Sequence, residues 1–162
     1  MNTQVNRFRI ALFATICWMI VMRIFSPPNI VQFEFAGTIQ SAIEIISNWG
    51  AEGIALAKTS IYLDFVFLVL YCAAISLGCR VASDYSKIPF LIKTGVVLSW
   101  IVWVSGICDA IENMGMLKTI DEINQTTISI SWYFAAVKFS ILAVALLFIL
   151  ISYFTGLVKK FI

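Results

Sequence analysis

Four apolar runs, each close to the length that a helix needs to cross a lipid bilayer, constrain this chain more than any other feature. They cover residues 8–26, 59–79, 93–117 and 131–157. A helix spans the hydrocarbon core with about 20 mainly apolar residues. The chain is also 61% hydrophobic and only 12% charged, which no soluble domain needs. We therefore predict an all-α integral membrane protein whose single domain, residues 1–162, is an up-and-down four-helix transmembrane bundle.

The first loop, residues 27–58, contains a shorter helical pattern. Apolar residues recur there at the spacing of one helix face: Ile39, Ala42, Ile43, Ile46 and Trp49. Thr38 before this segment and Gly50 after it are residue types that begin and end helices. We predict an amphipathic surface helix over residues 38–49, which either covers a site or only connects two spans.

The distribution of basic residues predicts the orientation. They concentrate near the two termini and in the 81–93 loop: Arg7, Arg9, Arg80, Lys87, Lys93, Lys159 and Lys160. The 27–58 and 118–130 loops are acidic by comparison. The positive-inside rule then places both termini in the cytoplasm.

The first run is not expected to be a signal peptide. Arg23 lies near its far end, and the run has no small-residue cleavage site. The net charge of +2 does not indicate a nucleic-acid partner, so membrane lipids are the expected partners.

The third run carries polar residues at the spacing of one helix face, because Asp109, Glu112 and Asn113 stand at i, i+3 and i+4. The rise per helical residue places the charges of all four runs in the outer half of the membrane. Charged groups inside a membrane face the bundle interior and mark functional sites. We predict one outward-opening pocket whose ligand-binding residues are Arg23, Asp64, Tyr71, Asp109, Glu112, Asn113 and Lys138.

The predicted pocket has an excess of one negative charge when every group is ionised, since three carboxylates face two cations. A buried excess charge is unfavourable. Protonation of one carboxyl, binding of a cation, or movement of Lys58 into the pocket would each remove it.

Three classes of function fit such a pocket. The leading hypothesis is binding of a small amphipathic or lipid-like ligand, with its polar head at the charges. The alternative is an intramembrane acid–base enzyme, an isomerase or cyclase of an isoprenoid-like substrate, with Asp64, Asp109 and Glu112 as catalytic residues. A purely structural or accessory subunit, in which the charges only fix helix register, is the third. Transport would need an oligomer with a central pore, because no inverted repeat is visible; a homo-oligomer stays open.

No cofactor or metal is predicted. The chain has no histidine, which argues against haem, di-iron and histidine-ligated zinc sites. Asp109, Glu112 and Asp64 would suit a hard cation, but Arg23 and Lys138 compete for the carboxylates. The four cysteines include no Cys-x-x-Cys pair and are expected to be packing residues.

Several short motifs together carry a resemblance. They are the segment from Phe33 to Thr38, the Trp49-Gly50 pair, Asp64-Phe65 with Tyr71, and Asp109-x-x-Glu112-Asn113. With these motifs the chain resembles an uncharacterised family of small bacterial four-span inner-membrane proteins. The resemblance extends from the first loop through the third run. It implies a bacterial inner-membrane location and no particular activity.

Overall fold

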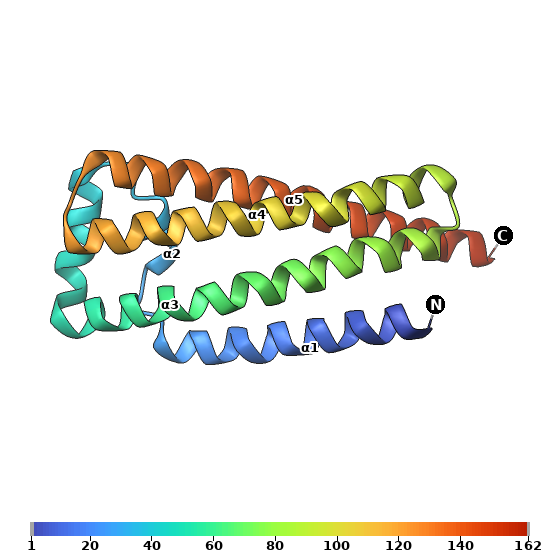
Figure 1. Cartoon of the computed structure of the whole chain (residues 1–162), viewed down its shortest axis with the longest axis horizontal. Helices are drawn as coiled ribbons and strands as arrows, with labels where there is room; N and C mark the ends of the chain where they lie inside the picture. Colours follow the sequence, from blue (N-terminus) through green and yellow to red (C-terminus); the bar gives the residue numbers. More distant parts are fainter. Residues whose placement is uncertain (1, 162) are drawn as a thin grey trace.

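Four long helices and one short helix make up the computed structural model, which describes residues 2–161. The helices are α1 (Asn2–Phe25), α2 (Ile30–Glu34), α3 (Ile39–Ser86), α4 (Pro89–Asp121) and α5 (Gln125–Phe161). The four long helices run up and down beside one another (Figure 1). Each covers one predicted apolar run to within one residue and extends beyond it, and each is long and apolar enough to cross a membrane. Within the described residues the fold is all-α, as predicted.

The two ends of the molecule differ. Both chain termini and the α3–α4 turn lie at one end (Figure 1). That turn uses Lys87 in the left-handed conformation to end α3 and Pro89 to begin α4. At the other end lie α2, the first turns of α3 and the α4–α5 connection (Figure 1). We call this second end the covered end.

The first turns of α3 run across the covered end, and the rest of that helix runs along the bundle (Figure 1). Thr38 caps them, its hydroxyl accepting a hydrogen bond of 3.2 Å from the Ser41 amide. Gly50 has φ +60° and ψ −170°, which other residues adopt only under strain, and there the chain turns into the long part of α3. The helix predicted over residues 38–49 is therefore present as a helix, with both of its ends explained by these two residues.

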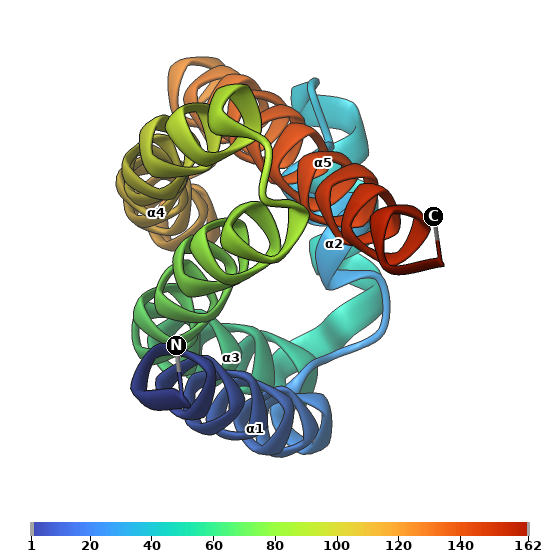
Figure 2. The same cartoon turned by 90° about the vertical axis from the view of Figure 1, so that its right-hand side faces the viewer.

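Helix α1 lies at the edge of the bundle, although the predicted pocket included its Arg23. Among the described residues, the backbone of α1 lies within 8 Å (Cα to Cα) of α3 but not of α4 or α5. Figure 2 shows α1 lying beside α3 alone, while α3, α4 and α5 pack on one another. A side chain on α1 hydrogen-bonds across this contact, since Trp18 Nε1 donates to the Leu63 carbonyl at 3.0 Å. The side chains of α1 are apolar on all faces of the helix and include the exposed Ile10, Phe13 and Ile24. The sequence of α1 therefore does not select a single face for burial.

Small residues let α3 and α4 approach closely. A Cβ added at Gly95 would lie 2.4 Å from Ser83 Oγ and 2.8 Å from the Cys79 carbonyl oxygen. One added at Gly106 would lie 2.8 Å from Cys72 Sγ. Contacts between small residues of this kind hold membrane helices together by close packing. They also bring α3 up against the segment of α4 that carries Asp109.

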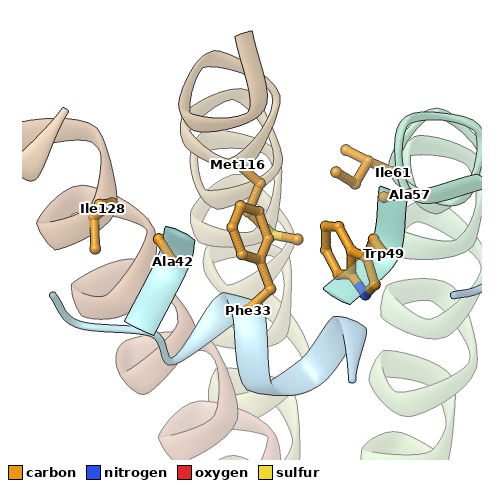
Figure 3. Packing of buried hydrophobic residues seen from close by; sticks show 7 residues of the cluster. All are labelled: Phe33, Ala42, Trp49, Ala57, Ile61, Met116 and Ile128. Atoms are coloured by element: carbon orange, nitrogen blue, oxygen red, sulfur yellow. The ribbon is translucent and has the colours of Figure 1, made fainter. Parts of the chain in front are cut away.

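Helix α2 is fixed to the covered end by a buried apolar cluster. Phe33 packs against Trp49 and Met116 there (Figure 3), and the Phe33 and Trp49 ring centroids are 5.0 Å apart. Trp49 also donates a hydrogen bond of 2.6 Å from Nε1 to the Pro28 carbonyl. Because Phe33 is only 4% exposed, the neighbouring Glu34 is held at a defined position over the bundle.

Candidate functional site

Lys138 of α5 is the centre of a buried group of charges. Its Nζ lies 2.9 Å from Asp109 Oδ1, 2.8 Å from Glu112 Oε2 and 3.7 Å from Glu34 Oε2. Asp109 is 2% exposed, Glu112 0% and Lys138 6%. Three helices deliver these side chains, namely α2, α4 and α5. We call the four residues the acid cluster.

Polar side chains from α3 extend the acid cluster along one face of α4. The Tyr71 hydroxyl donates a hydrogen bond of 2.8 Å to Asp109 Oδ2. Asn113 Nδ2 donates one of 2.7 Å to Asp64 Oδ2. Asp109, Glu112 and Asn113 are all buried, as their shared helix face predicted. The spacing in α4 therefore accounts for one whole side of the site.

Six of the seven predicted site residues come together in this way, and Arg23 does not. Arg23 is exposed at the end of α1 and forms no ion pair with any other described residue. It lines a separate open pocket of about 590 Å³ with residues of the α1–α2 connection. The prediction that Arg23 faces the other site residues was wrong. It was based on the position of Arg23 along the first run, and this position does not show which helices pack against α1.

Glu34 is the site residue that sequence reasoning missed. It was expected only as one acid of a polar loop, yet its side chain is 15% exposed and faces Lys138. One signal was available, since Glu34 stands between Phe33 and Phe35 in an otherwise apolar stretch. Burial of Phe33 carries Glu34 inward with it.

The site contains Glu34 and not the predicted Arg23, and this changes its net charge from the predicted value. Three carboxyl groups lie within 4 Å of the Lys138 ammonium, and Asp64 is joined to the site through its hydrogen bond with Asn113. With all four ionised, the site has an excess of three negative charges. Lys58 does not reduce this excess, since it pairs with Asp121 at the surface. Burial raises the pKa of Glu34 above its ordinary value, and the charge of Asp109 adds to this although Lys138 opposes it.

Two buried oxygen atoms of the acid cluster lack a hydrogen-bond donor. They are Glu34 Oε2 and Glu112 Oε2. The Lys138 ammonium donates to Asp109 Oδ1 and to Glu112 Oε1, each at 2.9 Å. The contact from Nζ to Glu112 Oε2 is close but does not have hydrogen-bond geometry. The Lys138 ammonium, at 2.8 Å from Glu112 Oε2 and 3.7 Å from Glu34 Oε2, is therefore the cation that faces both of these oxygens.

The acid cluster is closed, unlike the outward-opening pocket that was predicted. Glu34 of α2 covers it, and beside it Phe35 packs against Phe139 with the two rings tilted and their centroids 5.6 Å apart. An open polar pocket of about 330 Å³ lies beside α2, and its lining includes Gln32, Phe35 and Ala36. Closure follows from α2, whose position the loop sequence did not indicate.

No protein-family model, curated protein or solved structure matches this chain. Function is therefore argued from the acid cluster itself. Within residues 2–161 no group of acidic and cysteine side chains is arranged to hold a metal ion. An acid–base enzyme would need two carboxylates lining one apolar cavity, whereas Asp109 and Glu112 both point at Lys138. This geometry gives the enzyme alternative no support.

Proposed function

We propose that the protein is a multi-pass protein of the bacterial inner membrane with both termini in the cytoplasm. The four long apolar helices support the membrane location. The basic residues near the termini and the α3–α4 turn support the orientation, because these segments share one end of the molecule. A carboxyl-terminal fusion tests it: green fluorescent protein should fluoresce there, and alkaline phosphatase should be inactive. Active phosphatase would reverse the orientation.

Within that membrane, the protein binds a small amphipathic or lipid-like ligand at the acid cluster. The observation that carries this is the imbalance of four carboxyl groups against one ammonium. Fixing helix register takes one acid for one lysine, and burying further charges is a poor source of stability. A site with more acceptors than its own cation satisfies is suited to a ligand that supplies the remainder.

Helix α2 acts as the cover of this site. The covering role was expected of residues 38–49, but α2 places a carboxyl group directly on Lys138. The crossing turns of α3 support α2 from outside, since Trp49 holds both Phe33 and the Pro28 carbonyl. A ligand head would reach the charges on displacement of α2, while its apolar part stays among the helices.

Native mass spectrometry of the gently solubilised protein tests the binding. The wild-type protein should carry a specific bound mass, and Asp109→Asn should lose it. Asp121→Asn is the matched control, because Asp121 lies on the same helix but is exposed and pairs with Lys58. A wild-type protein without any bound mass, or an Asp109→Asn variant that retains it, would overturn the proposal.

A purely structural role is the second candidate, and the closure of the site favours it. Lys138 ties α5 to α4 and to α2, which is what a clasp between helices requires. The two roles differ in the same experiment. A clasp predicts that Asp109→Asn lowers thermal stability without changing the bound mass.

A further inference from the structure

Arg80 of α3 lies near the α3–α4 turn, at the opposite end of the bundle from the covered end. Its Nε donates a hydrogen bond of 2.9 Å to Ser99 Oγ, and its Cζ lies 5.9 Å from the centre of the Trp100 ring. Ser99 is 1% exposed and Trp100 is 66% exposed. The guanidinium is therefore held against α4, between a buried hydroxyl and an exposed aromatic ring.

Most N–H groups of this guanidinium have no partner within residues 2–161. Ser99 takes the Nε–H of Arg80, and no carboxylate lies within 4 Å of its nitrogens. The Nη atoms are not among the buried polar atoms that lack a hydrogen bond, so they are accessible from outside. Arginine has five N–H donors in a planar fork that fits a phosphate. The four donors on the Nη atoms thus remain for an anion from outside the chain.

The depth of Arg80 matches the level of the lipid head groups. Lys58 pairs with Asp121 at the surface of the covered end. Arg80 follows Lys58 by 22 residues within α3, which is about 33 Å along a helix axis. The hydrocarbon core of a bilayer is about 30 Å thick. A membrane whose hydrocarbon begins at Lys58 therefore ends at Arg80.

Helix α1 indicates the same level independently. A Cβ added at Gly78 of α3 would lie 3.2 Å from Phe8 Cε2. Arg7 and Arg9 flank Phe8 in the sequence, so they lie at about the level of Arg80. Arginines on two neighbouring helices thus mark one boundary of the hydrocarbon, as the positive-inside rule describes for the cytoplasmic side.

The charge at this end of the molecule favours an anion. Seven of the 11 basic residues gather here: Arg7, Arg9, Arg80, Lys87, Lys93, Lys159 and Lys160. Asp84 is the single acid at this end among the described residues, and it is exposed. Basic clusters beside a membrane attract anionic lipids. Arg80 differs from the other six because contacts with α4 fix its guanidinium, so it can select a head group as well as attract charge.

An exposed apolar stripe continues from the guanidinium toward the covered end. It consists of α4 residues at helical spacing that are each about half exposed or more: Val97, Trp100, Val104 and Ile107. An acyl chain of a lipid whose phosphate lies at Arg80 would run along this stripe. A free phosphate ion would gain nothing from it.

We propose that Arg80, Ser99 and Trp100 form a binding site for the phosphate of an anionic phospholipid in the cytoplasmic leaflet. The Nη groups donate to the phosphate oxygens, Ser99 fixes the guanidinium through Nε, and Trp100 packs beside the head group. The inference rests on the proposed membrane location and orientation. It does not depend on ligand binding at the acid cluster.

Native mass spectrometry of the full-length, delipidated protein in detergent tests the inference, with dioleoylphosphatidylglycerol and dioleoylphosphatidylcholine titrated as probes. The first phosphatidylglycerol should bind saturably and about tenfold more tightly than phosphatidylcholine. A large excess of inorganic phosphate should leave its binding unchanged. Equal binding of the two lipids would overturn the inference, and so would displacement of phosphatidylglycerol by inorganic phosphate, which would indicate a site for the free ion.

A matched pair of variants separates a defined site from general attraction of charge. Arg80→Gln should bind phosphatidylglycerol about tenfold more weakly, whereas Arg9→Gln should bind it as the wild type does, because Arg9 is an exposed arginine at the same end. Equal binding by Arg80→Gln and the wild type, or equal weakening by both variants, would overturn the inference. The comparison of the two lipids on the wild-type protein does not depend on a variant folding.

The outcome can be distinguished from failure of the proposed function. Asp109→Asn should leave phosphatidylglycerol binding unchanged, because Asp109 belongs to the acid cluster. Loss of phosphatidylglycerol binding in this variant would overturn the separation of the two sites. The carboxyl-terminal fusions test the orientation by themselves, and a reversed orientation with intact binding would overturn the assignment to the cytoplasmic leaflet alone.

Discussion

Replacing Lys138 by methionine, which has similar length and no charge, should destabilise the protein strongly. The ammonium lies 2.9 Å from Asp109 Oδ1, 2.8 Å from Glu112 Oε2 and 3.7 Å from Glu34 Oε2, with Lys138 only 6% exposed. Its loss would leave these carboxylates together without a cation. Removing one partner of a buried ion pair costs about 3–5 kcal/mol. For a domain of this size that corresponds to a fall in Tm on the order of 10 °C.

Thermal unfolding in mild detergent measures the effect, followed by intrinsic fluorescence. Lys159→Met is the control, because it removes a lysine from an exposed position of the same helix and should change stability by less than about 0.5 kcal/mol. The destabilisation of Lys138→Met should shrink as the pH falls, since burial raises the pKa of Glu34 and protonation of this carboxyl removes one of the charges that lost their partner.

Neutralising the acids should rescue the Lys138 variant. Adding Asp109→Asn and Glu112→Gln to Lys138→Met removes the unpaired charges, and a neutral polar core of similar shape should recover more than half of the lost stability. The reasoning is refuted if Lys138→Met lowers Tm by less than about 3 °C. It is also refuted if neither a lower pH nor the triple substitution reduces the destabilisation.

Three further outcomes are expected. Burial raises the pKa of Glu34, so the protonated side chain favours the folded state; this contribution is complete below about pH 4.5 and is lost as the pH rises through the raised pKa. Glu34→Gln should therefore flatten the decline of Tm as the pH rises above about 4.5, and an unchanged decline would contradict this. Tyr71→Phe removes the 2.8 Å hydrogen bond to Asp109 and should lower the free energy of unfolding, measured with denaturant, by about 2 kcal/mol. An unchanged free energy of unfolding would contradict the assignment of Asp109 as a buried, charged acceptor. Gly95→Ala places a Cβ 2.4 Å from its nearest neighbour and should cost about 1–3 kcal/mol by the same assay, whereas a neutral result would show that α3 and α4 are not in close contact there.

The sequence was sufficient for the parts of the fold that depend on local pattern. Hydrophobic length located the four long helices, and Thr38 with Gly50 located the ends of the crossing segment. The spacing of Asp109, Glu112 and Asn113 placed all three on one buried face. Each of these features is encoded within a few turns of the chain.

The features that the sequence did not reveal depend on lateral packing. Arg23 lies near the end of α1, but among the described residues the backbone of α1 is close to α3 alone. Arg23 therefore lines a separate pocket and forms no ion pair with the acids that its depth suggested as partners. Glu34 enters the site because Phe33 packs on Trp49 and Met116, three positions widely separated along the chain. Periodicity describes one helix at a time and does not report such contacts.

The short connection between α4 and α5 has a consequence for how the chain is inserted into the membrane. Only residues 122–124 separate the two helices, and Lys138 of α5 pairs with both Asp109 and Glu112 of α4. An aspartate near the centre of a lone helix costs about 2.5–3.5 kcal/mol on insertion. During synthesis α4 emerges before the lysine that pairs with it. We therefore expect α4 to wait at the translocon and to enter the bilayer together with α5 as a helical hairpin.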